Sequence, residues 1–220
     1  MRERFLSRDI LPRLPALVLG LIVFGTGVAM MAAAGVGLGP WEAFHQGISR
    51  LTGIPLGTVS ILLGLPILAL WIPIGQRPGI GTFLNVLLIG SSTNVALSLL
   101  PHPTELPLQV AQMALGVVTI GIGSGLYLGV DLGPGPRDGL MTGLHAKYGW
   151  SIRRARTIVE LTVLTLGFLL GGTVGLGTVA FAFGIGPVVQ WSLGIFDRSG
   201  RVARRRELRI LEDAPGTLGE

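Results

Sequence analysis

The residues best suited to chemistry lie in two short segments, each of which begins directly after a Gly-Pro pair. In the first segment, Pro40 suits the first position of a helix, because its fixed φ angle and missing N–H cost nothing there. Helical spacing then places Glu42, His45 and Ser49 on one side of a short amphipathic helix, with larger apolar residues on the other. The polar side is suited to contact a small solute or an ion.

The second segment repeats this arrangement with an acid at the same distance from a Gly-Pro pair. Helical spacing groups Asp138, Thr142 and His145 on one side, and Arg137 directly precedes Asp138 in the chain. Both segments are too short to cross a bilayer. They are either re-entrant helices that enter the membrane from opposite faces or helices that lie in its interface.

The two acids have a functional and a structural interpretation. If the starts of the two helices face each other, their unpaired N–H groups frame a polar site together with Glu42 and Asp138. Alternatively, each carboxylate only complements the partial positive charge at its own helix start, which is worth about 0.3–1 kcal/mol. The occurrence of an acid at the same position in both copies favours the functional interpretation.

Glu160 is a third candidate, because it stands inside a long apolar run. An ionisable group at membrane depth is costly and indicates a pathway or coupling site. The alternative is a local ion pair with Arg156, one helical turn earlier, whose long side chain reaches toward the membrane surface. The counterpart of Glu160 in the first half of the chain is Gly64, so its role is not shared by both halves.

Metal and hydrolase chemistry find little support in the same residues. The spacing of Glu42 and His45 is that of a di-metal carboxylate motif, but the second copy has Met141 where a histidine is needed. The chain has no cysteine. Ser124 lies in a string that lacks the leading glycine of a rhomboid-type protease, and the histidines lie in connecting segments. We therefore expect no enzyme activity, no metal and no cofactor.

The composition indicates a chain that folds in a lipid bilayer. Apolar residues make up 49% of the 220 residues and charged residues 13%, and the mean hydropathy is +0.66. Six apolar runs approach the roughly 20 residues that a helix needs to cross about 30 Å of hydrocarbon. They are residues 14–34, 56–74, 82–100, 108–130, 151–172 and 176–196. The sequence predicts an all-α membrane protein with six transmembrane helices.

The positive charges predict the orientation of these spans. If both termini are cytoplasmic, sixteen of the seventeen lysines and arginines fall on the cytoplasmic side, and Arg50 is the exception. The isoelectric point near 10.9 thus reflects topology, and no nucleic-acid partner is implied. The basic tail could also bind anionic lipids at the cytoplasmic face. The first run could instead be a cleaved signal peptide, but it is long and its counterpart lies inside the chain.

The chain contains an internal repeat. Residues 35–40 are similar in sequence to residues 129–134, and residues 79–82 are similar to residues 175–178. Each copy holds three of the six runs, an odd number, so the second copy must cross the membrane upside down relative to the first. We expect repeat 1 at 14–104 and repeat 2 at 105–196, with a basic N-terminus at 1–13 and a mixed-charge tail at 197–220.

The turns that open these units carry small residues with an expected structural role. These residues are Gly39, Pro40, Gly133, Pro134, Gly135, Pro136, Gly81, Thr82, Gly177 and Thr178. Glycine permits close helix approach or a positive φ angle, and the threonine hydroxyl can cap a helix start.

Inverted repeats are a recurring construction of secondary transporters, whose substrate sites lie where the repeats meet. The sequence therefore predicts a transporter or permease-like protein for a small solute or ion. The alternative is a membrane accessory or scaffold protein that assists another complex. Whether copies of the chain form a homo-oligomer stays open.

The motifs also resemble those of a known group. Residues 37–42, His45-Gln46-Gly47 and Gly57-Thr58 are similar to the first half of the YczE-like proteins, and residues 132–141 are similar to their second half. These proteins belong to the YczE/YyaS/YitT group of bacterial integral membrane proteins, in which the acid at the position of Glu42 is Asp. The resemblance covers about residues 12–200. It implies the inner membrane of a bacterium and names no substrate.

Overall fold

The computed structural model describes residues 10–197 and Gly200, and the regular structure of these residues is entirely helical. The expected basic N-terminus and mixed-charge tail lie almost wholly outside the described residues. A short 3-10 turn at Leu11–Arg13 precedes the first long helix. In chain order the helices are α1 (Leu14–Ala34), α2 (Pro40–Thr52), α3 (Leu56–Ala69), α4 (Trp71–Ile74), α5 (Ile80–Leu99), α6 (Leu106–Gly129), α7 (Pro136–Tyr148), α8 (Ile152–Leu169) and α9 (Leu176–Phe196).

Several of these helices are long and apolar enough to cross a membrane. Within the described residues five stretches qualify by length and composition, namely Leu11–Ala34, Leu56–Ile74, Ile80–Leu99, Leu106–Gly129 and Leu176–Phe196. The expected sixth run, residues 151–172, forms α8. It is not among the five, and its 18 residues include Arg153, Arg154, Arg156 and Glu160. The all-helical membrane class is therefore confirmed, whereas a sixth span is not shown by composition.

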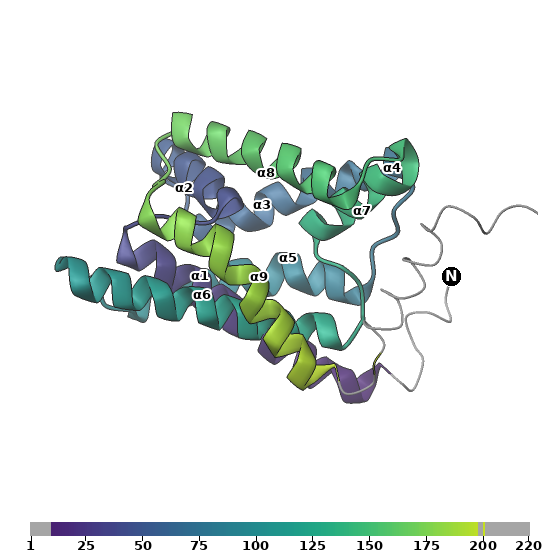
Figure 1. Ribbon diagram of the computed structural model, residues 1–220, viewed down its shortest axis with the longest axis horizontal. Coiled ribbons are helices and arrows are strands. Elements are labelled where there is room, and N and C mark those ends of the chain that lie inside the picture. Colours follow the sequence, from purple (N-terminus) through teal and green to yellow (C-terminus); the bar gives the residue numbers. More distant parts are fainter. Residues whose placement is uncertain (1–9, 198–199, 201–220) are drawn as a thin grey trace, which may run out of the picture.

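The centre of the fold is the pair α1 and α6, which pack along each other, with α5 against α1 and α9 against α6 (Figure 1). Small residues allow this close approach. A Cβ on Gly27 would lie 2.7 Å from the backbone nitrogen of Ile120, and a Cβ on Gly116 would lie 2.9 Å from the carbonyl oxygen of Gly27. Leu17 and Leu21 of α1 are fully buried beside this contact line.

Each short helix packs against the other half of the chain. Helix α2 lies along α8, where a Cβ on Gly167 would come within 2.6 Å of the backbone nitrogen of Phe44. Helix α7 lies against α4, and the indole N–H of Trp71 donates to the carbonyl oxygen of Pro136 at 3.0 Å. The two halves are thus interlocked through α2 and α7.

The loop before α2 enters the helical layer alongside α9. Gly35 ends α1 in a left-handed conformation, with φ of 71°. The N–H of Gly177, near the start of α9, donates to the carbonyl oxygen of Val36 at 2.9 Å. Gly39 then lies against the ring of Phe181, one turn further along α9. Helix α2 therefore begins among the long helices instead of on their surface.

The loop before α7 enters in the same way alongside α5. The N–H of Gly81 donates to the carbonyl oxygen of Leu132 at 2.9 Å, and both partners stand 96 residues from those of the first bond. Gly135 then lies beside the side-chain amide of Asn85. The Thr82 hydroxyl accepts from the N–H of Gly79 at 3.1 Å and donates to the carbonyl oxygen of Pro134 at 2.8 Å. Thr82 thus caps the start of α5 and ties it to the loop before α7.

Gly37 and Gly133 are the most sensitive points of the two loops. Their φ angles are 133° and 125°, which L side chains rarely adopt, and a Cβ on Gly37 would lie 2.7 Å from the nitrogen of Thr178. We expect Gly37→Ala and Gly133→Ala each to destabilise the folded protein by about 1–3 kcal/mol. Thermal unfolding in detergent measures this.

Gly194→Ala is the matched control, because nothing lies within 4 Å of its Cβ position. Equal thermal midpoints for Gly37→Ala and Gly194→Ala would contradict the loop docking described above.

Candidate functional site

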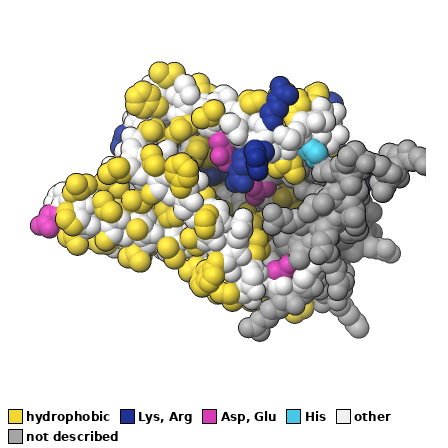
Figure 2. All heavy atoms as spheres, in the orientation of Figure 1, with side chains coloured by type: hydrophobic (Ala, Val, Ile, Leu, Met, Phe, Trp, Pro, Cys, Tyr) yellow, Lys and Arg dark blue, Asp and Glu magenta, His cyan; other side chains and the backbone are white. Residues whose placement is uncertain are grey.

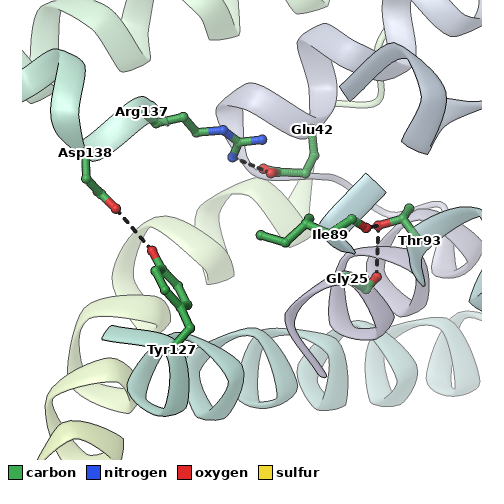
Figure 3. A network of polar contacts seen from close by, with 7 residues as sticks. All are labelled: Gly25, Glu42, Ile89, Thr93, Tyr127, Arg137 and Asp138. Atoms are coloured by element: carbon green, nitrogen blue, oxygen red, sulfur yellow. Dashed lines mark hydrogen bonds and ion pairs between the residues drawn. The ribbon is translucent and has the colours of Figure 1, made fainter. Parts of the chain in front are cut away.

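The first turns of α2 and α7 meet inside the molecule. Arg137, the second residue of α7, donates through Nη1 to Oε1 of Glu42, the third residue of α2, at 2.5 Å (Figure 3). The two residues are 95 positions apart, and Glu42 is only 5% exposed. The two helix starts therefore do face each other, as the functional interpretation of the two acids required.

The second acid is held by a residue that the sequence argument missed. The hydroxyl of Tyr127, on α6, donates to Oδ2 of Asp138 at 3.2 Å (Figure 3). Tyr127 is 5% exposed. A tyrosine inside an apolar run was the available signal, because a buried phenolic hydroxyl needs a hydrogen-bond partner.

Both acids also lie close to their own helix starts. Glu42 and Asp138 each occupy the third helical position, and a Cβ on Gly39 would lie 2.6 Å from Oε2 of Glu42. A carboxylate there complements the unpaired N–H groups and the helix dipole. The structural and functional interpretations are thus both compatible with the geometry, since one carboxylate can complement a helix start and also contact a neighbour.

Two buried nitrogens beside the ion pair have no hydrogen-bond partner among the described residues. They are Nε1 of Trp41 and Nε2 of His45. The guanidinium of Arg137 stacks over the Trp41 ring at 5.1 Å from its centroid. Burial, and in second place the guanidinium of Arg137, lower the pKa of His45 below its ordinary value. An unsatisfied buried polar atom is rare, so these two nitrogens are the features of the site most in need of a partner.

These side chains line a cavity of about 590 Å³. The ionisable groups on its wall include Glu42, Arg137, Asp138, Arg156 and Glu160. Figure 2 shows acidic and basic side chains gathered in a hollow at the centre of one face of the molecule. Aromatic and aliphatic side chains of α1, α6 and α9 form much of the remaining wall, together with the polar groups of Asn85 and Gln190.

Glu160 lies both in a local ion pair and on the cavity wall. Nε of Arg156 donates to Oε1 of Glu160 at 2.9 Å, so the local ion pair exists. Both side chains also line the cavity, at the side formed by α8.

Thr142 and His145 are not brought to the cavity. The Thr142 hydroxyl donates to the carbonyl oxygen of Gly139 at 3.2 Å, and Nδ1 of His145 lies 2.6 Å from the carbonyl oxygen of Trp150. Neither residue lines the cavity wall. Helical spacing correctly puts them on one side with Asp138, but they lie further along α7, which runs away from the site.

The two ion pairs differ in burial, and this predicts a difference in stability. The side chains of Arg137 and Glu42 are 26% and 6% exposed, against 58% and 34% for Arg156 and Glu160. Removal of one partner of a buried pair costs about 3–5 kcal/mol, whereas an exposed pair contributes about 0–1 kcal/mol. We expect Glu42→Gln to lower the thermal midpoint clearly and Glu160→Gln to change it little. Equal shifts would show that the Glu42 pair is not buried in the folded protein.

Comparisons with known proteins agree with the resemblance noted in the sequence. An uncharacterised protein of Haemophilus influenzae is 40% identical over 182 residues, which cover 83% of this chain and 84% of the relative. The uncharacterised membrane protein YczE of Bacillus subtilis is 35% identical over 176 residues, with 79% and 82% covered, and YyaS of the same organism is 22% identical over 165 residues, with 73% and 82% covered. No solved structure matches. Because residues 11–193 match the family of unknown function DUF6198, the chain belongs to that family.

Proposed function

We propose that this protein is a transporter that binds and moves a small solute through the cavity between α2 and α7. The observation that supports this most is the convergence of five acidic and basic side chains (Asp, Glu and Arg), from α2, α7 and α8, on one cavity inside a bundle of apolar helices. Charged groups at membrane depth are costly, and they face water-filled cavities or transport pathways where they occur. A purely structural protein would have no need to gather them there.

The proposal includes a sixth span, α8, in the inner membrane of a bacterium. Helix α8 starts at the end of the molecule where Lys147 donates to the carbonyl oxygen of Pro73 at 2.7 Å. It ends at the opposite end, where Arg50 donates to Gly171 and Thr173. Its 18 residues measure about 27 Å at 1.5 Å per residue. The arginines of its first turns lie near the membrane surface, where long side chains reach the interface.

The proposal also treats the two halves as inverted repeats with re-entrant α2 and α7. The pairing of α1 with α5 matches that of α6 with α9, and the contact of α2 with the second half matches that of α7 with the first. The two loop bonds, Gly177 to Val36 and Gly81 to Leu132, keep the same offset. Half-helices whose starts meet at the junction of inverted repeats are a known design for a substrate site.

The topology has a direct test, because the chain has no native cysteine. Thr52, at the end of α2, and Ala146, near the end of α7, are both exposed. In intact cells we expect Thr52→Cys to react with a membrane-impermeant maleimide, and Ala146→Cys to react only after the membrane is permeabilised. Reaction of both variants from the same side would exclude the inverted repeat.

Solute passage has a test that does not require the solute. Ser60 lines the cavity, and cysteine is close to serine in size, so the replacement changes the cavity wall little. We expect Ser60→Cys to react with a charged methanethiosulfonate reagent from the outside of oriented vesicles and from their lumen. Thr52→Cys and Ala146→Cys serve as one-sided controls. Reaction of Ser60→Cys from one side only would favour the accessory or scaffold function.

A further inference from the structure

The two halves differ at the contact between the second and third long helices of each repeat. In the first half, α3 and α5 pack tightly. A Cβ on Gly57 or on Gly90 would collide with the carbonyl group of the other residue. About two turns further along α3, Gly64 lies against the side chain of Val86, with Cγ1 of Val86 2.7 Å from the Cβ position of the glycine. The N–H of Gly57 also donates to Oδ1 of Asn94 at 2.7 Å.

The second half carries large charged residues at the corresponding positions. At the offset of 96 that relates the starts of α5 and α9, Gly57 corresponds to Arg153 and Gly64 to Glu160. The counterpart of Gly90 is Gly186, and nothing lies within 4 Å of its Cβ position. Helices α8 and α9 are joined at one end and diverge from it (Figure 1). Residues of both helices line the cavity, so a cleft lies between α8 and α9 where the glycine contact is absent.

This cleft is the part of the cavity that lies between α8 and α9. The long helices run across the view in Figure 1, and helices that span a membrane run roughly along its normal. Figure 2 has the same orientation, so the face that it shows is a side of the molecule that would face lipid in the proposed membrane. One wall, on α9, is apolar and includes Phe181, Ile185 and Val189. The other wall, on α8, carries Arg156 and Glu160. A charged wall open to hydrocarbon is costly, so an occupant with a polar head and an apolar tail fits this cleft.

The charges of the cavity indicate the kind of head. Glu42, Asp138 and Glu160 carry three negative charges, and Arg137 and Arg156 carry two positive charges. The starts of α2 and α7 add about half a positive charge each. The total is close to zero, with both signs present, which favours a head group that is neutral overall and carries separated charges.

We propose that the cavity holds the zwitterionic head group of a phospholipid whose acyl chains lie in the cleft between α8 and α9. This inference rests on the proposed function and names its solute. The phosphate lies near Arg137, where Nε1 of Trp41 and Nε2 of His45 lack partners, and the ammonium group lies near Asp138. Both unpartnered nitrogens belong to residues that line the cavity and are at most 7% exposed.

The test measures the binding of lipids to the purified full chain, with native mass spectrometry as the readout. The probes are phosphatidylethanolamine, phosphatidylglycerol with the same acyl chains, and the water-soluble head group glycerophosphoethanolamine. We expect phosphatidylethanolamine to bind about tenfold more tightly than phosphatidylglycerol, which corresponds to one charge-assisted hydrogen bond. Equal binding of the two lipids would overturn the assignment of the head group.

A substitution in the cleft tests whether the lipid lies between α8 and α9. Gly186→Trp fills the cleft without a backbone clash, and we expect it to weaken phosphatidylethanolamine binding about tenfold or more. Gly194→Trp is the matched control, because this glycine of α9 also has nothing within 4 Å of its Cβ position but does not line the cavity. We expect it to bind as the native chain does.

The remaining outcomes separate this inference from the proposed function. If glycerophosphoethanolamine binds as tightly as the lipid and Gly186→Trp has no effect, the placement of the acyl chains in the cleft is wrong. If no lipid binds while Ser60→Cys still reacts from both sides, the lipid assignment is wrong and solute passage survives. If Ser60→Cys reacts from one side only, passage itself is wrong.

Discussion

Two equivalent backbone hydrogen bonds hold the site together: Gly177 donates to Val36, and Gly81 donates to Leu132. Each fastens the loop of one half to the helix start of the other. Non-helical backbone inside a membrane is tolerated only where its polar groups are satisfied by protein or water. These bonds meet part of that demand, and they let α2 and α7 begin inside the bundle. The meeting of Glu42 with Arg137 depends on them.

The charged groups at this meeting point stabilise one another. Glu42 complements the start of α2 and at the same time pairs with Arg137, while Asp138 complements the start of α7 and accepts from Tyr127. An isolated carboxylate in this position would be very costly to bury. Opposite charges, two helix starts and a phenol together reduce that cost enough for a polar cavity to persist among apolar helices.

The near-symmetry of the chain makes its one large departure informative. Where both helices of a pair carry glycine, as at Gly57 and Gly90, they touch. Where one of them carries arginine and glutamate instead, as on α8, the helices separate and the cavity gains an opening. Because of these charged residues, α8 is not among the helices that qualify as membrane spans by length and composition. One set of residues thus accounts for both the open cleft and the unusual polarity of α8.

Much of this protein follows from sequence alone, because the responsible signals are local. Apolar runs give the long helices, Pro40 and Pro136 mark the starts of α2 and α7, and the doubled motif relates Glu42 to Asp138 and identifies the family.

The hydrogen-bond partners of these acids could not be predicted from such local signals. Whether Arg137 reaches Glu42, and whether Tyr127 reaches Asp138, depends on how helices distant in sequence are placed against each other. Helical spacing specifies which side chains share a face but not where the helix lies. It therefore groups Thr142 and His145 with Asp138, although neither of the two lines the cavity. The sequence by itself determined the helices, the doubled Gly-Pro motif and the acids at the two helix starts. Only the tertiary structure decided which of these groups share the cavity and on which side it opens, because that depends on packing between the two halves.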